Sequence, residues 1–196
     1  MSLARRPVLA LTVGDPAGIG PEIVRAALAA PDVRGVAHVV AIGPGTLRPR
    51  DVPSIEREDV RDLRGAAWLD SGGPARWEMG RVQVACGRVA LDALHLGHEL
   101  VLGGAADALV NAPVSKEALH AAGERCEGQS ELLGRWCGVE RFEMVAVAEK
   151  LRVMLLTRHL PLRKALDASR ANGANPSQTQ SPAQSRASSQ EKERVS

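Results

Sequence analysis

The sequence has little aromatic character and almost no excess of either charge. Its 196 residues include no tyrosine, one phenylalanine and three tryptophans. Because a surface that stacks nucleic-acid bases needs several aromatic side chains, a single-strand nucleic-acid binder is disfavoured. Lys and Arg together number 25 against 23 Asp and Glu, which leaves a net charge of +2. That balance predicts neither a nucleic-acid nor a membrane partner.

Cysteine is also scarce, and its spacing carries no metal or disulfide signature. Cys86, Cys126 and Cys137 are odd in number and form no CxxC pair, which disfavours a disulfide framework or a zinc knuckle. No apolar run approaches the roughly 18 to 20 residues that span a bilayer. The short apolar run near the N-terminus lacks a signal-peptide cleavage site. We therefore expect a cytoplasmic protein whose cysteines are thiols.

The composition of the chain changes near residue 167. Residues 1–167 alternate apolar runs with Gly and Pro, whereas residues 168–196 are rich in Ser, Gln, Asn and Ala and contain one large apolar residue, Val195. A segment of that composition cannot bury enough apolar surface to offset the entropy that it loses on ordering. The sequence therefore predicts a folded region over 1–167 and a disordered low-complexity tail over 168–196.

The folded region shows strands that alternate with helices. Continuous apolar runs at 7–13, 36–43 and 107–112 are typical of strands buried on both faces. Weaker patterns predict further strands at 81–86, 142–148 and 151–157, and helices at 21–30, 88–102, 115–122 and 131–137. The stretch 44–75 is rich in Pro, Gly and charge and matches neither pattern. The alternation predicts an α/β fold with a largely parallel sheet.

The first candidate site is the loop after the first strand, which reads GDPAGIGPE from Gly14 to Glu22. Glycine permits tight turns and the close approach of a ligand, and N–H groups at a helix start favour an anion or a cofactor edge. Candidate cofactor-binding residues are Gly14, Asp15, Gly18 and Gly20. The dinucleotide fingerprint GxGxxG is absent, and a loop that merely connects strand to helix explains the pattern equally well.

The second candidate site is the segment NAPVSK, from Asn111 to Lys116, at the carboxyl end of the strand predicted at 107–112. Open α/β sheets bind ligands just outside the carboxyl ends of their strands. Lys116 can contact a phosphate or carboxylate, or take part in proton transfer. A solvated lysine in the first turn of a helix is the alternative interpretation.

Two further segments carry polar groups that suit a binding site. Gln129 and Ser130, within EGQSE, both donate and accept hydrogen bonds and so suit an alcohol or phosphate ligand; alternatively, Ser130 or Gly128 caps the following helix. His159, within TRHLPL, follows an apolar strand and can ligate a metal or act as an acid or base. A surface or packing histidine is the alternative there.

Taken in order, the segments GDPAGIGPE, NAPVSKEAL, EGQSE and TRHLPL resemble the 4-hydroxythreonine-4-phosphate dehydrogenase family of vitamin B6 biosynthesis, over roughly residues 7–167. The GD…GIGPE element is also similar to its counterpart in isopropylmalate and isocitrate dehydrogenases. The resemblance implies an isopropylmalate/isocitrate dehydrogenase-like α/β/α sheet. It also implies a homodimer of two-domain subunits, with the site in the cleft and at the dimer interface.

The resemblance further implies a reaction and its cofactors. Family members use NAD or NADP to oxidise 4-phosphooxy-L-threonine, and the product then loses carbon dioxide. A divalent cation (zinc, magnesium or cobalt) held by three histidines polarises the hydroxyl and later the ketone, while the nicotinamide accepts the hydride. His159 matches the first of these histidines, and Gln129 and Ser130 match a substrate-binding His-Thr pair. Lys116 matches a family lysine, to which we assign a catalytic role.

The sequence departs from the family in two respects. Family members are about twice as long as the matching region, so we expect the C-terminal half of the fold to be missing, together with the other two metal histidines and much of the cofactor site. The change near residue 168 is typical of a frameshift, a premature stop or a gene-model error. Gln129 replaces a titratable histidine, which favours a different phosphorylated hydroxy acid as substrate.

These departures leave a second hypothesis open. The chain would then be a catalytically inactive remnant that only self-associates or pairs with a full-length paralogue. A sheet that lacks half of its strands exposes apolar faces and strand edges, so we expect self-association or poor solubility. An isopropylmalate-type decarboxylating dehydrogenase is disfavoured, since NAPVSK and TRHLPL match the phosphothreonine family better.

Overall fold

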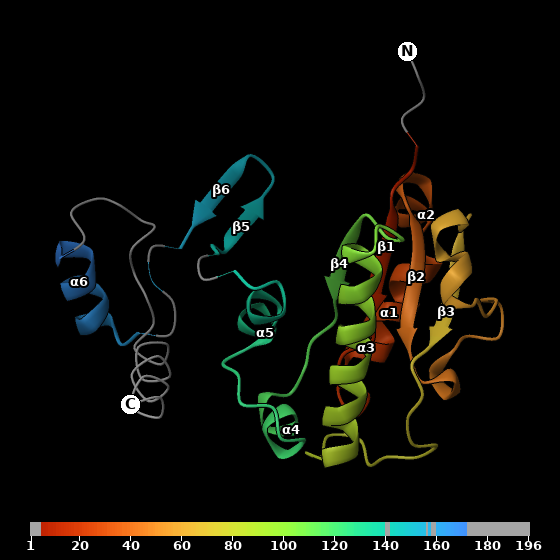
Figure 1. Cartoon of the computed structure of the whole chain (residues 1–196), viewed down its shortest axis with the longest axis horizontal. Coiled ribbons are helices and arrows are strands. Elements are labelled where there is room, and N and C mark those ends of the chain that lie inside the picture. The colour runs from red at the N-terminus through yellow and green to blue at the C-terminus, as the bar shows by residue number, and fades with distance from the viewer. Residues whose placement is uncertain (1–4, 140–141, 156, 158–159, 172–196) are drawn as a thin grey trace, which may run out of the picture. The chain divides into compact units, whose positions relative to one another are not determined.

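The computed structural model describes residues 5–139, 142–155, 157 and 160–171. The chain separates into two compact units, residues 1–133 and 134–196. The first unit is built on a sheet with helices on its faces, and the second contains a β-hairpin and a helix (Figure 1). Within the described residues, no helix is both long enough and apolar enough to cross a bilayer.

The sheet of the first unit is entirely parallel. Its strands are β1 (Val8–Thr12), β2 (His38–Gly43), β3 (Ala66–Asp70) and β4 (Ala108–Asn111), in the order β3-β2-β1-β4. In the register of the sheet, Leu9 of β1 lies between Val39 of β2 and Ala108 of β4. The three strands predicted from continuous apolar runs are β1, β2 and β4, so the predicted α/β class with a parallel sheet is confirmed.

The connections between these strands are helical. The helices are α1 (Gly20–Ala29), α2 (Pro31–Val36), α3 (Val84–Leu102) and α4 (Lys116–Ala121), with short 3₁₀ turns η1 (Gly45–Leu47) and η2 (Arg57–Asp62). Helices α1 and α2 connect β1 to β2, and α3 connects β3 to β4. Pro21 in the first turn of α1 suits that position because its missing N–H would have no helical partner there.

The core of the first unit consists of two apolar clusters, one on each face of the sheet. Ala10 of β1 belongs to the cluster that contains Leu100 of α3, and the next residue, Leu11, belongs to the cluster that contains Val24 of α1. Because successive strand residues point to opposite faces, a strand that is apolar at every position feeds both clusters. The strands β1 and β2 are thus covered on both faces, whereas β4 at the edge of the sheet is only half-buried.

The second unit contains the strands β5 (Val145–Ala148) and β6 (Leu151–Met154), which form an antiparallel hairpin, and the helix α6 (Leu162–Ala171). Helix α5 (Gln129–Trp136) spans the boundary between the two units. Helix α6 continues past position 167, where the composition changes. Residues 172–196 lie outside the described residues, so the disordered tail stays a prediction.

One predicted strand is wrong, and one strand of the sheet was not predicted. The segment 81–86 alternates apolar and other residues, but α3 begins at Val84, and Cys86 is buried in the first turn of that helix. The missing strand is β3, inside the stretch 44–75. Its sequence AAWLD has no β-branched residue, and burial of Trp68, whose indole N–H donates to the Gly43 carbonyl at 3.0 Å, stabilises it in the sheet.

Candidate functional site

Two of the candidate segments lie at the point where the strand order of the sheet reverses. The order β3-β2-β1-β4 places the second strand on one side of β1 and the fourth strand on the other. Loops at the carboxyl ends of such a strand pair diverge and leave a crevice in which α/β proteins bind ligands. The loop from Gly14 to Ile19 follows β1, and the segment from Ala112 to Ser115 follows β4, so both candidate segments are at this position (Figure 1).

The two loops contact one another directly. The main-chain N–H of Asp15 donates to the carbonyl of Pro113 at 3.0 Å. Gly14 has a φ of +68°, and a Cβ atom at this position would overlap the same carbonyl oxygen, while a Cβ atom at Gly20 would overlap the carbonyl of Val13. Contacts inside the protein therefore require glycine at both positions, and glycine there is not in itself a sign of a bound ligand.

Asp15 organises the loop that follows β1. Asp15 is 6% exposed, and its Oδ1 accepts a hydrogen bond from the N–H of Ala17 at 2.8 Å. Its carbonyl accepts from the N–H of Gly18 at 3.1 Å. These bonds occupy the N–H groups of Ala17 and Gly18, which a phosphate bound in this loop would need. They also place a carboxyl group beside the other N–H groups of the loop. The loop is therefore better suited to a hydrogen-bond donor, such as a hydroxyl, than to a phosphate.

The thiol of Cys86 lies near this loop but is not suited to nucleophilic chemistry. Cys86 is fully buried. Burial raises the pKa of the thiol, the negative charge of Asp15 raises it further, and a hydrogen bond with the backbone of Ala17 opposes these effects. Because the thiolate is the reactive form, a thiol held protonated in this way is inert at neutral pH. The position of Cys86 is explained by packing.

Gln129 connects the third candidate segment to the second. It is the first residue of α5, and its side-chain Nε2 donates to the carbonyl of Ala112 at 3.2 Å. Its Oε1 atom is buried and has no hydrogen-bond partner among the described residues. The carbonyl of Gly128 accepts from the N–H of Leu132 at 3.3 Å, so Gly128 occupies the cap position and Ser130 lies within the first turn. Neither Gln129 nor Ser130 is therefore required as the helix cap.

Lys116 is the first residue of α4, and its side chain is exposed. The preceding residue, Ser115, caps this helix, because its Oγ accepts from the N–H of Ala118 at 3.1 Å. The same hydroxyl donates to Oε2 of Glu117 at 3.2 Å. The pKa of Glu117 is lowered by its own backbone N–H and then by this hydroxyl. The segment thus has a structural role in starting α4, while the ammonium of Lys116 is accessible to a ligand.

The fourth candidate, His159, lies outside the described residues. Among the residues that the structure describes, no three His, Cys, Asp or Glu side chains are grouped closely enough to hold a metal ion. The structure thus brings together the loop at Asp15, the strand end at Ala112 and the side chain of Gln129. The carbonyl of Ala112 was not singled out from the sequence, because a main-chain acceptor leaves no signal in the residue type.

Comparison with known proteins places the chain in a family. The family described as "Pyridoxal phosphate biosynthetic protein PdxA" matches residues 28–176. The 4-hydroxythreonine-4-phosphate dehydrogenase of Geobacter metallireducens is 35% identical over 167 residues, which cover 79% of this chain and 49% of that protein. The D-threonate 4-phosphate dehydrogenase of Salmonella typhimurium is 34% identical over 172 residues, which cover 81% and 53% of the two chains.

The solved structures agree with these relatives. The crystal structure of a 4-hydroxythreonine-4-phosphate dehydrogenase from Burkholderia phymatum matches with a TM-score of 0.74 and 30% identity, and covers 85% of this chain and 53% of that one. The chain spans about half the length of the curated relatives that it matches. The motifs, the fold and these matches agree, and the chain belongs to the PdxA family of pyridoxal phosphate biosynthetic proteins.

Proposed function

We propose that the chain supplies substrate- and cofactor-binding groups to an NAD(P)-dependent dehydrogenase that oxidises and decarboxylates 4-phosphooxy-L-threonine or a related phosphorylated hydroxy acid. One observation carries the proposal. The loop at Asp15, the strand end at Ala112 and the side chain of Gln129 meet at the carboxyl edge of the sheet. The names of the relatives, which refer to 4-hydroxythreonine-4-phosphate and D-threonate 4-phosphate, support the substrate class.

Gln129 is the proposed contact for a hydroxyl or ammonium group of the substrate. A carbonyl oxygen only accepts hydrogen bonds, so the amide nitrogen of Gln129 must face Ala112 and the amide oxygen must face away. That oxygen is an acceptor without a partner among the described residues, and a buried polar atom is stabilised by gaining a donor. An amide does not titrate, so this position binds a ligand without exchanging a proton with it. Ser130, the next residue in α5, is the second proposed substrate contact.

Asp15 and Lys116 are the proposed contacts at the other end of the site. The carboxyl group of Asp15, held by the N–H of Ala17, suits a hydroxyl of the nicotinamide nucleotide, with Gly14, Gly18 and Gly20 shaping the loop around it. The exposed ammonium of Lys116 suits a phosphate or carboxylate, or a proton transfer at the oxidised carbon. A bound nicotinamide would supply the hydride acceptor.

The described residues do not form a complete set of ligands for a divalent cation. A catalytic metal site usually has three protein ligands, and His159 is the one candidate that the sequence offers. That the protein binds a divalent cation and forms a homodimer is proposed from its membership of the family.

A second possibility is that the chain binds ligand without turning it over. The chain spans about half the length of its curated relatives, and the site described above lies within that half. In this case the groups at Asp15 and Gln129 would bind the phosphorylated acid, but hydride transfer would need residues that lie outside this sequence. The chain would then be an inactive remnant or one component of a larger enzyme.

The experiment separates turnover from binding. The purified chain is mixed with NAD or NADP, with magnesium, zinc or cobalt, and with 4-phosphooxy-L-threonine or D-threonate 4-phosphate. Nicotinamide absorbance reports turnover, and calorimetry reports binding of each acid without turnover. Binding that weakens about tenfold in Gln129→Leu, and not in the control Gln83→Leu on an exposed turn, is the expected result. If neither acid binds the wild-type chain under any of these conditions, the proposal is wrong.

A further inference from the structure

Asn111 is the last residue of β4, at the carboxyl end of the strand, and none of the contacts proposed above uses its side chain. In the register of the sheet it lies opposite Thr12, the last residue of β1. The N–H of the next residue, Ala112, donates to the carbonyl of Thr12 at 3.1 Å, and the carbonyl of Ala112 accepts from Gln129. Asn111 is therefore fixed on a rigid strand, next to the residue that orients Gln129.

The side chain of Thr12 is held in one orientation by the core. Thr12 is 1% exposed. Its methyl carbon Cγ2 faces α3, where it would lie 3.3 Å from a Cβ atom added to Gly97. A β-branched side chain has few rotamers available, so with the methyl group against α3 the hydroxyl faces β4. There the hydroxyl donates to Oδ1 of Asn111 at 3.5 Å.

This hydroxyl determines which way the amide of Asn111 faces. Oδ1 of Asn111 is the one acceptor that the Thr12 hydroxyl has among the described residues. With the amide turned over, Nδ2 would face the hydroxyl, and the buried O–H would lose its acceptor. A buried donor without an acceptor is costly. Oδ1 therefore faces Thr12, and Nδ2 faces away from β1.

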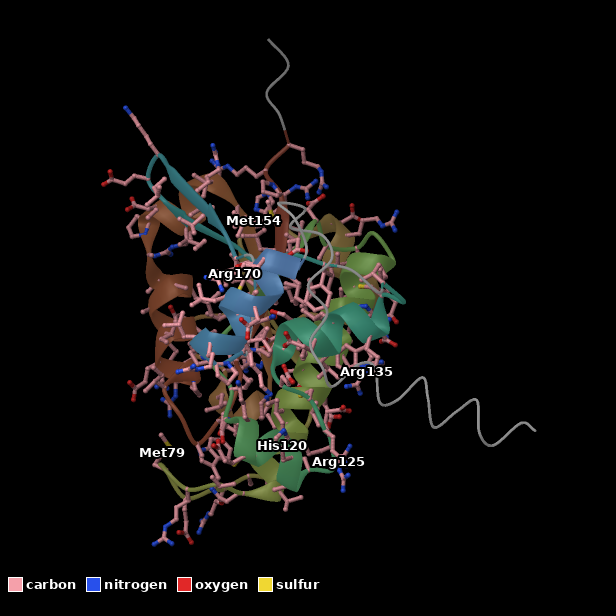
Figure 2. All side chains as sticks on the ribbon, turned by 90° about the vertical axis from the view of Figure 1, so that its left-hand side faces the viewer. Met79, His120, Arg125, Arg135, Met154 and Arg170 are labelled. Atoms are coloured by element: carbon pink, nitrogen blue, oxygen red, sulfur yellow. The ribbon has the colours of Figure 1, made fainter. Side chains whose placement is uncertain are left out.

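The amide nitrogen of Asn111 is a donor that a ligand can reach. Within the part of the chain that the structure describes, Nδ2 has no hydrogen-bond partner, and it is not one of the enclosed polar atoms. Figure 2 shows His120 of α4 and Met79 of the segment before α3 at the same end of the first unit. These segments follow β4 and β3, so that end is the carboxyl edge of the sheet, where Asn111 lies.

A phosphorylated hydroxy acid needs donors at this edge for its carboxylate and phosphate oxygens. The N–H groups of Ala17 and Gly18 are occupied by Asp15. The carboxyl group of Asp15 and the free Oε1 of Gln129 are acceptors. Among the candidate groups described above, the donors left for an oxyanion are the ammonium of Lys116 and Nδ2 of Asn111. A hydrogen bond to an ionised acceptor is also stronger than one between neutral groups.

We propose that Nδ2 of Asn111 binds an oxyanion of the ligand, either a carboxylate or a phosphate oxygen, and that Thr12 is the residue that positions this amide. The inference rests on the proposed function and adds to it a residue that determines specificity. A donor fixed at the end of β4 favours ligands with an anionic acceptor at that point. Thr12 itself does not touch the ligand, because it is enclosed between β4 and α3.

The first experiment measures binding of D-threonate 4-phosphate to the purified chain by calorimetry. Asn111→Leu removes the donor and is expected to weaken binding at least about tenfold. Asn111→Asp keeps an acceptor for Thr12 but faces the oxyanion with a negative charge, and is expected to weaken binding about a hundredfold. Val36→Asp adds the same charge at an exposed residue of α2, at the other edge of the sheet, and is expected to bind as the wild type does.

Two further readouts depend on the chemistry of the contact. Calorimetry at pH 5.5 in buffers of different ionisation enthalpy is expected to show that Asn111→Asp takes up more protons on binding than the wild type, because the protonated carboxyl group can donate. D-threonate, which lacks the phosphate, identifies the oxyanion. Its affinity falls in Asn111→Leu when the carboxylate is the partner, and is unchanged in that variant when the phosphate is.

The role of Thr12 is tested by two variants with opposite effects. Thr12→Val keeps the shape of the side chain but loses the hydroxyl, so binding is expected to weaken about fivefold while the melting temperature is kept. Thr12→Ser keeps the hydroxyl but loses the methyl group that packs against Gly97. We expect its melting temperature to fall while its affinity stays that of the wild type. A purely structural role would make affinity follow the melting temperature instead.

The outcomes separate this inference from the proposed function. Wild-type binding that is unchanged in both Asn111→Leu and Asn111→Asp would overturn the inference and leave the proposed function standing. A wild-type chain that binds neither D-threonate 4-phosphate nor 4-phosphooxy-L-threonine would overturn both. Affinity that follows the melting temperature in the two Thr12 variants would reduce Thr12 to a packing residue and overturn its positioning role.

Discussion

The side-chain amide nitrogen of Gln129 lies 3.2 Å from the main-chain carbonyl oxygen of Ala112 and donates a hydrogen bond to it. This bond ties the first residue of α5 to the residue that follows β4, 17 positions earlier in the chain. It also determines which way the amide faces, because only the nitrogen can donate. The orientation of a proposed ligand contact is therefore set by a main-chain atom.

Replacing Gln129 with glutamate tests this orientation. An ionised carboxylate only accepts hydrogen bonds, so Gln129→Glu would face the Ala112 carbonyl with an acceptor and leave the carbonyl without its donor. We expect a loss of about 1–3 kcal/mol in the free energy of unfolding at pH 7, measured by urea denaturation. The loss should shrink at pH values below the pKa of the new carboxyl, because the protonated group can donate again.

The matched control for this variant is Gln83→Glu. Gln83, the half-buried residue before α3, also donates from Nε2 to a main-chain carbonyl, that of Glu78 at 2.8 Å, and its Oε1 accepts from the N–H of Glu78 at 3.1 Å. Both bonds are exposed to solvent, so water replaces a lost partner. We expect this control to change stability by less than about 0.5 kcal/mol. Equal losses in the two variants at pH 7 would show that the bond of Gln129 has no special structural role.

The parts of the fold that the sequence predicts well are those with a strong local pattern. The segments that became β1, β2 and β4 are apolar at nearly every position, a pattern that predicts a strand. The strands β1 and β2 are almost entirely buried, whereas β4, at the edge of the sheet, is only half-buried and exposes Val110. The strand β3 lacks that pattern, since AAWLD contains no β-branched residue and ends in a charge. Its place in the sheet depends on pairing with β2, which is a long-range contact that local sequence does not report.

In the candidate site, too, the sequence predicts what depends on local pattern and misses what depends on long-range contacts. The sequence locates Asp15, Lys116 and Gln129 because their segments follow strands or precede helices. It does not show that Gln129 faces Ala112, or that Asp15 uses its carboxyl group to hold Ala17. Such orientations depend on how separate segments pack, so residue type and spacing alone cannot supply them.

Gly14 is expected to be one of the residues least tolerant of change in the first unit. Gly14→Ala adds a Cβ atom that overlaps the carbonyl of Pro113, at a φ of +68° that side chains rarely adopt. We expect the free energy of unfolding to fall by about 3 kcal/mol, as the sum of backbone strain and the displaced carbonyl. Thermal and urea unfolding of the variant measure the loss.

Two glycine controls separate the two causes of that loss. Gly123 has a φ of +95° and nothing within 4 Å of an added Cβ atom, so Gly123→Ala should show the backbone strain alone, about 1 kcal/mol. Gly35 in α2 also has open space, at an ordinary φ, so Gly35→Ala should be neutral or stabilising by about 0.5–1 kcal/mol. A Gly14→Ala variant no less stable than Gly123→Ala would contradict the close contact with Pro113.

Ser115 is expected to stabilise α4 through its hydroxyl. Ser115→Ala removes the acceptor for the N–H of Ala118, which should lower the free energy of unfolding by about 1 kcal/mol. It also removes the second cause of the lowered pKa of Glu117, so that pKa should move up toward its ordinary value but remain below it, because the backbone N–H still contributes. NMR titration of Glu117 measures the shift. Ser115→Thr keeps the hydroxyl, and a changed Glu117 pKa in that control would argue against the bond.

His38, the first residue of β2, is expected to make stability depend on pH. Its Nδ1 accepts a hydrogen bond from the N–H of Gly65 at 2.8 Å, which requires that this nitrogen carry no proton. The pKa of His38 is lowered from its ordinary value of 6.5, first by burial and then by the positive charges of Arg64, Arg6 and Arg5. The folded state therefore binds fewer protons than the unfolded state as the pH falls below that ordinary value.

The sign of the effect follows from this difference in bound protons. The contribution of His38 to the free energy of unfolding should be fully present above pH 6.5 and should be lost as the pH falls through the lowered pKa of the folded state. In His38→Asn the side-chain oxygen can accept from Gly65 without titrating, so this part of the pH dependence should disappear. His120→Gln is the control, because the Nε2 of His120 bonds the carbonyl of Cys126 and can donate in either charge state. Urea denaturation of the three proteins between pH 5 and pH 8 measures the slopes, and a slope unchanged in His38→Asn would contradict the assignment.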